Sequence, residues 1–84
     1  MVTEVNEDIQ VCAHFREGRL FPLWFVWHSR FYKVTSVTSR WSSREGRAAK
    51  HHLTVLAGGT CELYELCFDT ERLAWSLGRI ASAA

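Results

Sequence analysis

Four histidines and three cysteines are the residues of this chain best suited to bind a metal or to act as nucleophiles. One residue separates Cys12 from His14, and five separate Cys61 from Cys67. Neither spacing matches a zinc-binding pattern, and Cys61 and Cys67 lie too far apart along one extended strand to share an ion. We therefore predict no metal site and no bound cofactor, and we interpret the thiols as small hydrophobic side chains.

Nucleophilic catalysis by Cys61 or Cys67 would need a histidine base that a third group orients, together with donors for an oxyanion. Nothing in the sequence beside either thiol supplies them, and no phosphate-binding loop is present. Glu62 and Glu65 fall on opposite faces of the strand expected around them, so they are not a paired acid and base. We predict that the chain is not an enzyme and has no catalytic residues.

The candidate binding site is the basic middle of the chain. Residues 14–50 carry eight Lys or Arg against two Glu, a charge of +6, whereas residues 1–13 carry −3 and residues 51–84 carry −2. Cations neutralise phosphates while exposed aromatic rings stack on bases, and small β-barrels often present both. The residues of this candidate nucleic-acid site are Arg30, Lys33, Arg40, Trp41, Arg44, Arg47 and Lys50.

Two other interpretations of this segment compete with nucleic-acid binding. In the first, the aromatic side chains belong to the core and the arginines only solubilise an edge strand. In the second, the domain binds another protein, which adds a strand to an open sheet edge or covers an aromatic patch. Because the net charge of the whole chain is only +1, the sequence favours a non-catalytic protein-interaction or accessory module, with nucleic acid as the alternative partner.

Composition indicates one small globular domain. The chain has 84 residues, 48% of them hydrophobic and 13% aromatic, which suits a dense core in a single domain. The odd number of cysteines and the acidic first residues argue against a secreted protein with a signal peptide. The longest apolar run, residues 20–27, contains Pro22 and is too short to cross a membrane as a helix. We expect a cytoplasmic protein with no membrane contact.

Alternation of apolar and polar residues predicts that β-strands carry these side chains. The slip of phase between Val34 and Val37 indicates a β-bulge. Gly18 and the glycine pair at 58–59 mark turns that need positive φ, and residues 42–50 are expected to form the most mobile loop. The predicted strands are residues 9–16, 20–28, 31–41, 51–57 and 60–69.

The end of the chain fits two structures, because Leu73, Leu77 and Ile80 have helical spacing while Leu73, Trp75 and Leu77 alternate as in a strand. The sequence thus predicts an all-β fold, with a short C-terminal helix as an option. Five or six strands form an antiparallel meander that closes into a small barrel or half-barrel. The expected boundaries are a flexible acidic lead-in over residues 1–8, one β domain over 9–80 and a disordered tail over 81–84.

One stretch of the chain also resembles a known family. From Pro22 to Trp41 the sequence spells P-x-x-F-x-W-x-x-R-x-Y-x-V-x-x-V-x-x-x-W, and Tyr64-Glu65-Leu66 and Trp75-x-Leu77 follow. This pattern resembles a family of small uncharacterised bacterial domains over roughly residues 9–80. Some of those domains occur beside, or as appendages of, proteins similar to translesion DNA polymerases. The resemblance implies an all-β fold in which the Trp75 segment is a strand, and it implies no catalytic residues.

Overall fold

The computed structural model of this protein describes residues 2–59 and 61–82. Every element in these residues is a strand, which confirms the all-β prediction and makes the last segment a strand rather than a helix. No helix in the described part of the chain is long and apolar enough to span a membrane. The strands are β1 (Val2–Arg16), β2 (Arg19–Trp27), β3 (Arg30–Glu45), β4 (Ala48–Ala57), β5 (Glu62–Asp69) and β6 (Ala74–Ser82).

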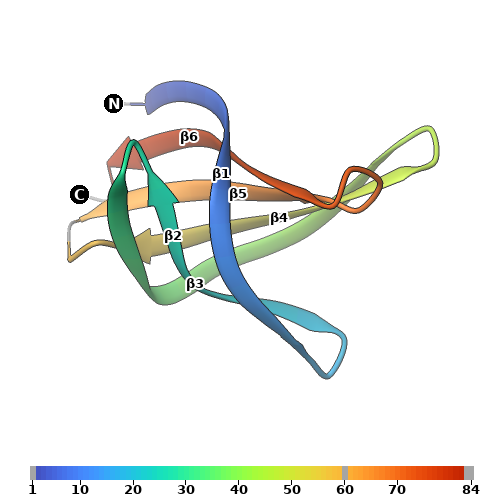
Figure 1. The fold of residues 1–84 in the computed structure, drawn as a ribbon, viewed down its shortest axis with the longest axis horizontal. Helices are drawn as coiled ribbons and strands as arrows, with labels where there is room; N and C mark the ends of the chain where they lie inside the picture. The colour runs from blue at the N-terminus through green and yellow to red at the C-terminus, as the bar shows by residue number, and fades with distance from the viewer. Residues whose placement is uncertain (1, 60, 83–84) are drawn as a thin grey trace.

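The six strands form one antiparallel sheet that closes into a barrel-like ring (Figure 1). Each strand pairs with the next along the chain, and β1 closes the ring by pairing with β6. β1 reaches both neighbours because its two halves pair with different strands. Val2 to Ile9 pair with β6, and Gln10 to Arg16 pair with β2.

The predicted start of the first strand at Ile9 is too late, because residues 2–8 are already part of β1. Two of their acidic side chains face cations of the opposite end of the chain: Asp8 Oδ2 lies 3.0 Å from Arg72 Nη2, and Glu4 Oε1 lies 3.8 Å from Arg79 Nη2. The sequence pattern of residues 1–8 is polar, so this pairing had no hydrophobic signal. Met1 and residues 83–84 lie outside the described residues, whereas Ala81 and Ser82 belong to β6.

Residues 42–50 are not the loop that the sequence predicts. β3 and β4 pair without interruption from Arg40 opposite Leu53 to Glu45 opposite Ala48, leaving only Gly46 and Arg47 in the turn. Gly46 has a φ of 60°, which suits the first central position of a two-residue hairpin turn. In this segment, which lacks apolar alternation, the strands are joined by polar cross-strand pairs such as Ser42 with His51. The predicted bulge between Val34 and Val37 is confirmed, since the register shifts between Val34 and Ser36.

Turns of the predicted kind join most other strands. Glu17 and Gly18, with φ of 53° and 75°, connect β1 to β2. The β2–β3 turn falls on His28 and Ser29, both at positive φ, one residue earlier than the alternation indicates. In the β5–β6 turn, Asp69 Oδ1 accepts hydrogen bonds from the amides of Glu71 and Arg72 at 2.9 and 3.2 Å.

The core fills the inside of the ring. Phe25, Val55, Leu66 and Leu77 are fully buried, and the Phe25 ring stacks on Tyr32 with centroids 4.9 Å apart and planes 9° apart. The sequence predicts eight core residues, of which Phe25, Leu53, Val55 and Leu66 are buried. The other four pack against this cluster but are only partly buried. These four are Trp27, Tyr32, Val34 and Trp75.

Candidate binding site between β2 and β3

The closed ring is weakest between β2 and β3. These strands pair over only four residues each, residues 24–27 with residues 30–33 next to their shared turn. Beyond that point residues 19–23 continue beside β1, and residues 34–45 continue beside β4. The β1–β2 hairpin consequently diverges from the β3–β4 hairpin, as Figure 1 shows. We call the gap between residues 19–23 and residues 34–45 the seam.

The hairpin register shows which backbone groups of β3 face the seam. In a two-residue hairpin, the residues that flank the turn form a hydrogen-bonded pair, and every second pair after it does the same. Glu45, Ser43 and Trp41 therefore bond to β4. Arg44, Ser42 and Arg40 alternate with them, so their N–H and C=O groups point away from β4. Within the described residues, no backbone partner occupies this side of β3.

The opposite side of the seam is already protected. By the same register, Leu20 and Pro22 of β2 direct their backbone groups away from β1 and into the seam. The Leu20 carbonyl accepts a hydrogen bond from Arg40 Nη1, and Pro22 has no N–H to offer. Proline is a common way of blocking strand addition at an edge, and the Arg40 guanidinium occupies a carbonyl that an added strand would need. The open edge of the seam is thus β3.

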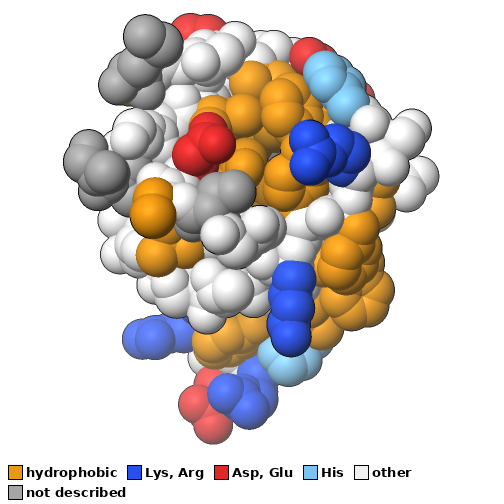
Figure 2. All heavy atoms as spheres, turned by 90° about the vertical axis from the view of Figure 1, so that its left-hand side faces the viewer, with side chains coloured by type: hydrophobic (Ala, Val, Ile, Leu, Met, Phe, Trp, Pro, Cys, Tyr) orange, Lys and Arg blue, Asp and Glu red, His pale blue; other side chains and the backbone are white. Residues whose placement is uncertain are grey.

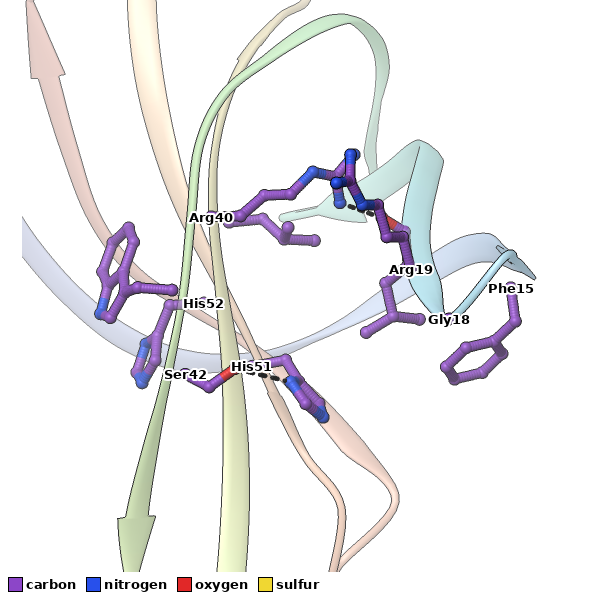
Figure 3. A pocket seen from close by; sticks show the side chains of 10 residues that line it. Phe15, Gly18, Arg19, Arg40, Ser42, His51 and His52 are labelled. Atoms are coloured by element: carbon purple, nitrogen blue, oxygen red, sulfur yellow. Dashed lines mark hydrogen bonds between the residues drawn. The ribbon is translucent and has the colours of Figure 1, made fainter.

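Arg40 spans the seam. Its guanidinium carbon lies 4.8 Å from the centroid of the Phe21 ring, and that of Arg16 lies 5.2 Å from the same ring. Together with the bond to the Leu20 carbonyl, the Phe21 contact fixes the plane of the Arg40 guanidinium. Figure 3 shows Arg40 reaching from β3 towards Arg19 on the β1–β2 hairpin.

A groove of about 270 Å³ lies at the seam. Leu20 and Leu53 give it an apolar floor, and Phe15, 71% exposed, stands at its rim. Arg19, Arg40 and His51 bring nitrogen donors to it, and no Asp or Glu is among the described residues that line it. His51 Nδ1 lies 3.1 Å from Ser42 Oγ, so the imidazole is held against β3 (Figure 3). The arrangement suits an anionic group next to an extended chain.

The structure brings only part of the predicted nucleic-acid site to this groove. Arg40 lines it, and Arg44 lies four residues further on the same face of β3, with Arg47 in the adjoining turn. Trp41 and His52 also line the groove, and the Trp41 ring stacks on His52 with ring centroids 5.0 Å apart and planes 5° apart. Lys50 is half-buried and pairs with Glu45, Nζ to Oε2 at 3.5 Å. Of the predicted residues, Arg40 and Trp41 therefore line one groove, whereas Lys50 does not.

The other two predicted residues lie outside the groove. Arg30 belongs to the β2–β3 turn region, with its guanidinium carbon 5.9 Å from the centroid of the Tyr32 ring. Lys33 is exposed where β2 and β3 still pair. In their place the groove contains Arg19, His51 and Phe15, which sequence reasoning left out. Arg19 follows the Gly18 turn within the same basic region, but only the divergence of two hairpins brings it opposite Arg40.

A second cavity of about 430 Å³ opens at the other end of the ring. Trp27, Tyr32 and Tyr64 line it, with Tyr32 and Tyr64 ring centroids 5.4 Å apart. Arg30 and Glu62 also line it, so both charges are present. Figure 2, which faces this end, shows hydrophobic side chains bordered by basic and acidic ones. Mixed charge and rings that already contact each other give this cavity no clear ligand class.

The thiols and imidazoles do not form an activated pair in the described residues. Cross-strand pairing puts His52 opposite Cys67, yet the buried Nδ1 of His52 has no hydrogen-bond partner, and its Nε2 lies 2.9 Å from Ser43 Oγ. Burial raises the pKa of the Cys67 thiol above its ordinary value, which lowers the thiolate fraction at neutral pH. No group of three or more metal-binding side chains occurs in the described ranges.

Comparisons with known proteins identify no relative of this chain. No protein-family model matches the chain, and searches of curated proteins and of solved structures give no match. The family resemblance drawn from the sequence stays a prediction.

Proposed function

We propose that this domain is a non-catalytic protein-interaction module that binds an extended segment of another protein as an added strand along β3. The observation that supports it is the open edge of β3, where Arg40, Ser42 and Arg44 direct backbone donors and acceptors into a seam that no other strand fills. In strand addition, main-chain hydrogen bonds supply affinity and pockets for alternate side chains supply specificity. The groove beside this edge is such a pocket.

Strand addition also explains why only one side of the seam is protected. An unprotected edge is a liability, and a chain that blocks β2 with Pro22 and with the Arg40 contact leaves β3 exposed. Each added residue pair would contribute a hydrogen bond worth about 0.5–1.5 kcal/mol net. The resemblance to domains that accompany polymerase-like proteins supports an accessory role of the same kind.

The experiment is a selection of peptides from a random library against the full chain, followed by amide exchange of the free and bound protein. In the free protein, the amides of Arg40, Ser42 and Arg44 should exchange faster than those of Trp41 and Ser43. A selected peptide should slow exchange at Arg40, Ser42 and Arg44. Equal protection of both sets in the free protein would show that the β3 edge is not open.

Two variants of one residue test the backbone contact. Ser42→Pro removes the N–H that faces the seam without removing a bond to β4, whereas Ser42→Ala keeps that N–H. Both variants lose the contact with His51, so their comparison isolates the backbone donor. The selected peptides should bind the alanine variant and lose affinity for the proline variant by about fivefold or more. Equal binding by two folded variants would contradict strand addition along β3.

Single-stranded nucleic acid is the second candidate, because Arg19, Arg40 and His51 line a groove without carboxylates. The stacking of Trp41 on His52 weakens it, because the face of the Trp41 ring that contacts His52 is not free to stack on a base. Titration of labelled oligothymidylate at two salt concentrations tests it. Wild type should bind at low salt, and an Arg44→Glu, Arg47→Glu variant should not. A wild type that does not bind at low salt ends this candidate.

A further inference from the structure

The charges around the seam are predominantly positive. Arg19 and Arg40 line the groove, Arg44 continues the same face of β3, and Arg16 lies against Phe21 beside Arg40. The nearest carboxylate on the β3–β4 hairpin, Glu45, lies on the opposite face and contacts Lys50. An occupant of the seam consequently meets several cations, and no acidic side chain of the described residues lines its groove.

Arg40 is prepared for a bidentate partner. A guanidinium has five N–H donors in a planar fork, and Arg40 is seen to use Nη1 for the Leu20 carbonyl. The Phe21 ring at 4.8 Å fixes the plane in which its other donors lie. A planar, restrained guanidinium matches a carboxylate better than a flexible one does, because less side-chain freedom is lost on binding.

The register decides which side chains of an added strand reach these donors. Along any strand, alternate side chains point to opposite faces of the sheet. A strand paired to β3 would place one set of side chains beside Arg40, Ser42 and Arg44, and the other set beside Trp41 and Ser43. Acidic residues at every second position would therefore all face the arginines.

A second copy of this chain is a poor occupant. Two β3 edges paired with each other would bring Arg40 and Arg44 of one copy close to those of the other. Like charges directly opposite one another destabilise a strand pair. The same arginines that discourage self-association favour an acidic strand.

We propose that the partner segment is an acidic extended peptide whose alternate Asp or Glu side chains bind Arg19 and Arg40 in the groove. This inference rests on the proposed function and names the chemical class of the partner. The backbone of the peptide pairs with β3, and its carboxylates accept hydrogen bonds from the two guanidinium groups. Its remaining side chains lie on the Trp41 face, where apolar residues fit.

The test uses the full chain and two synthetic peptides, one alternating valine with glutamate and the other alternating valine with glutamine. Both have the same shape and the same strand propensity pattern, and they differ only in the charge of one face. Backbone amide shifts of the isotope-labelled protein give affinity and location together. The glutamate peptide should bind about tenfold or more tightly than the glutamine peptide, with shifts at Arg40, Ser42 and Arg44.

Three matched variants locate the charge contact. Arg19→Gln and Arg40→Gln should each weaken the glutamate peptide by about fivefold or more and leave the glutamine peptide little changed. Lys33→Gln removes the same charge from the same strand as Arg40 but outside the groove, and it should have an effect below about twofold. The Arg19 side chain makes no hydrogen bond or ion pair within the described residues, so its variant reports on binding even if Arg40→Gln disturbs the seam.

Each other outcome overturns a defined statement. If both peptides bind equally, the acidic preference is wrong while strand addition survives. If neither peptide binds and the β3 amides do not shift, both proposals are wrong. If oligothymidylate binds, loses affinity in the Arg19 and Arg40 variants, and the peptides do not bind, the seam is a nucleic-acid site and the acidic-peptide proposal is overturned.

Discussion

Phe25 should be the side chain on which the stability of this ring depends most. It is fully buried, stacks on Tyr32 at 4.9 Å and meets the edge of Tyr64 at 5.3 Å. Truncating a buried Phe to Ala costs about 3–5 kcal/mol, and two aromatic contacts place Phe25→Ala in the upper part of that range. A chain of 84 residues has a free energy of unfolding of about 4–13 kcal/mol, so a loss of about 4 kcal/mol removes between roughly a third and all of it.

Urea unfolding followed by tryptophan fluorescence measures this loss. With a slope of about 1–2 kcal/mol per molar urea, a loss of 4 kcal/mol would move the midpoint by roughly 2–4 M. Phe31→Ala is the matched control, because Phe31 is 62% exposed and contacts Trp24 at 5.8 Å. It should cost less than about 1 kcal/mol. Equal midpoint shifts for the two variants would refute the placement of Phe25 at the centre of the core.

Three further results are expected. Gly58→Ala should destabilise the fold more than Gly18→Ala. Both glycines have positive φ, but only at Gly58 would a Cβ lie 3.0 Å from a tyrosine ring. Equal melting temperatures for the two variants would contradict this. The amide of Arg72 donates a hydrogen bond to Asp69 and holds the pKa of its carboxyl below the ordinary value. The stability that this carboxylate contributes is therefore present above the unfolded pKa and lost as the pH falls through the folded pKa. In Asp69→Asn, the loss of stability on the acid side should become shallower. Burial raises the pKa of Cys67, so its contribution is full below the unfolded pKa and lost as pH rises through the folded one. Cys67 should alkylate more slowly at pH 8 in the folded chain than in denaturant, as mass spectrometry can measure, and equal rates would contradict the burial.

The strands could be predicted from the sequence wherever one face is apolar. Phe25 and Val55 alternate with more exposed neighbours, so their period identifies both the strand and its inner face. Residues 2–8 and 42–50 have no such period. Residues 2–8 pair with β6 and form ion pairs such as Asp8 with Arg72. Residues 42–50 are held by polar contacts such as Ser42 with His51. No local sequence pattern links these partners.

The candidate site was only partly predictable for a related reason. The charge of the middle segment is visible in the sequence, and Arg40 and Arg44 of that segment are exposed. Which face each residue takes depends on register, and a single bulge between Val37 and Ser39 changes it for the rest of the strand. The Trp41 ring therefore stacks on His52, while Arg19 joins Arg40 from another hairpin.

The pairing of β1 with β6 gives the ring no topological beginning. Every strand pairs with a strand on each side. Val2 lies opposite Ala81, so the two ends of the described chain meet in the sheet (Figure 1). Joining those ends with a short linker and opening the chain at the Glu17–Gly18 turn would preserve every strand pair. The order in which the strands are synthesised would change while the barrel stays the same. In such a permutant, β1 and β2 would be the last and first strands, and their pairing would close the ring. The groove would then form between the same strands although the chain connects them in a different order.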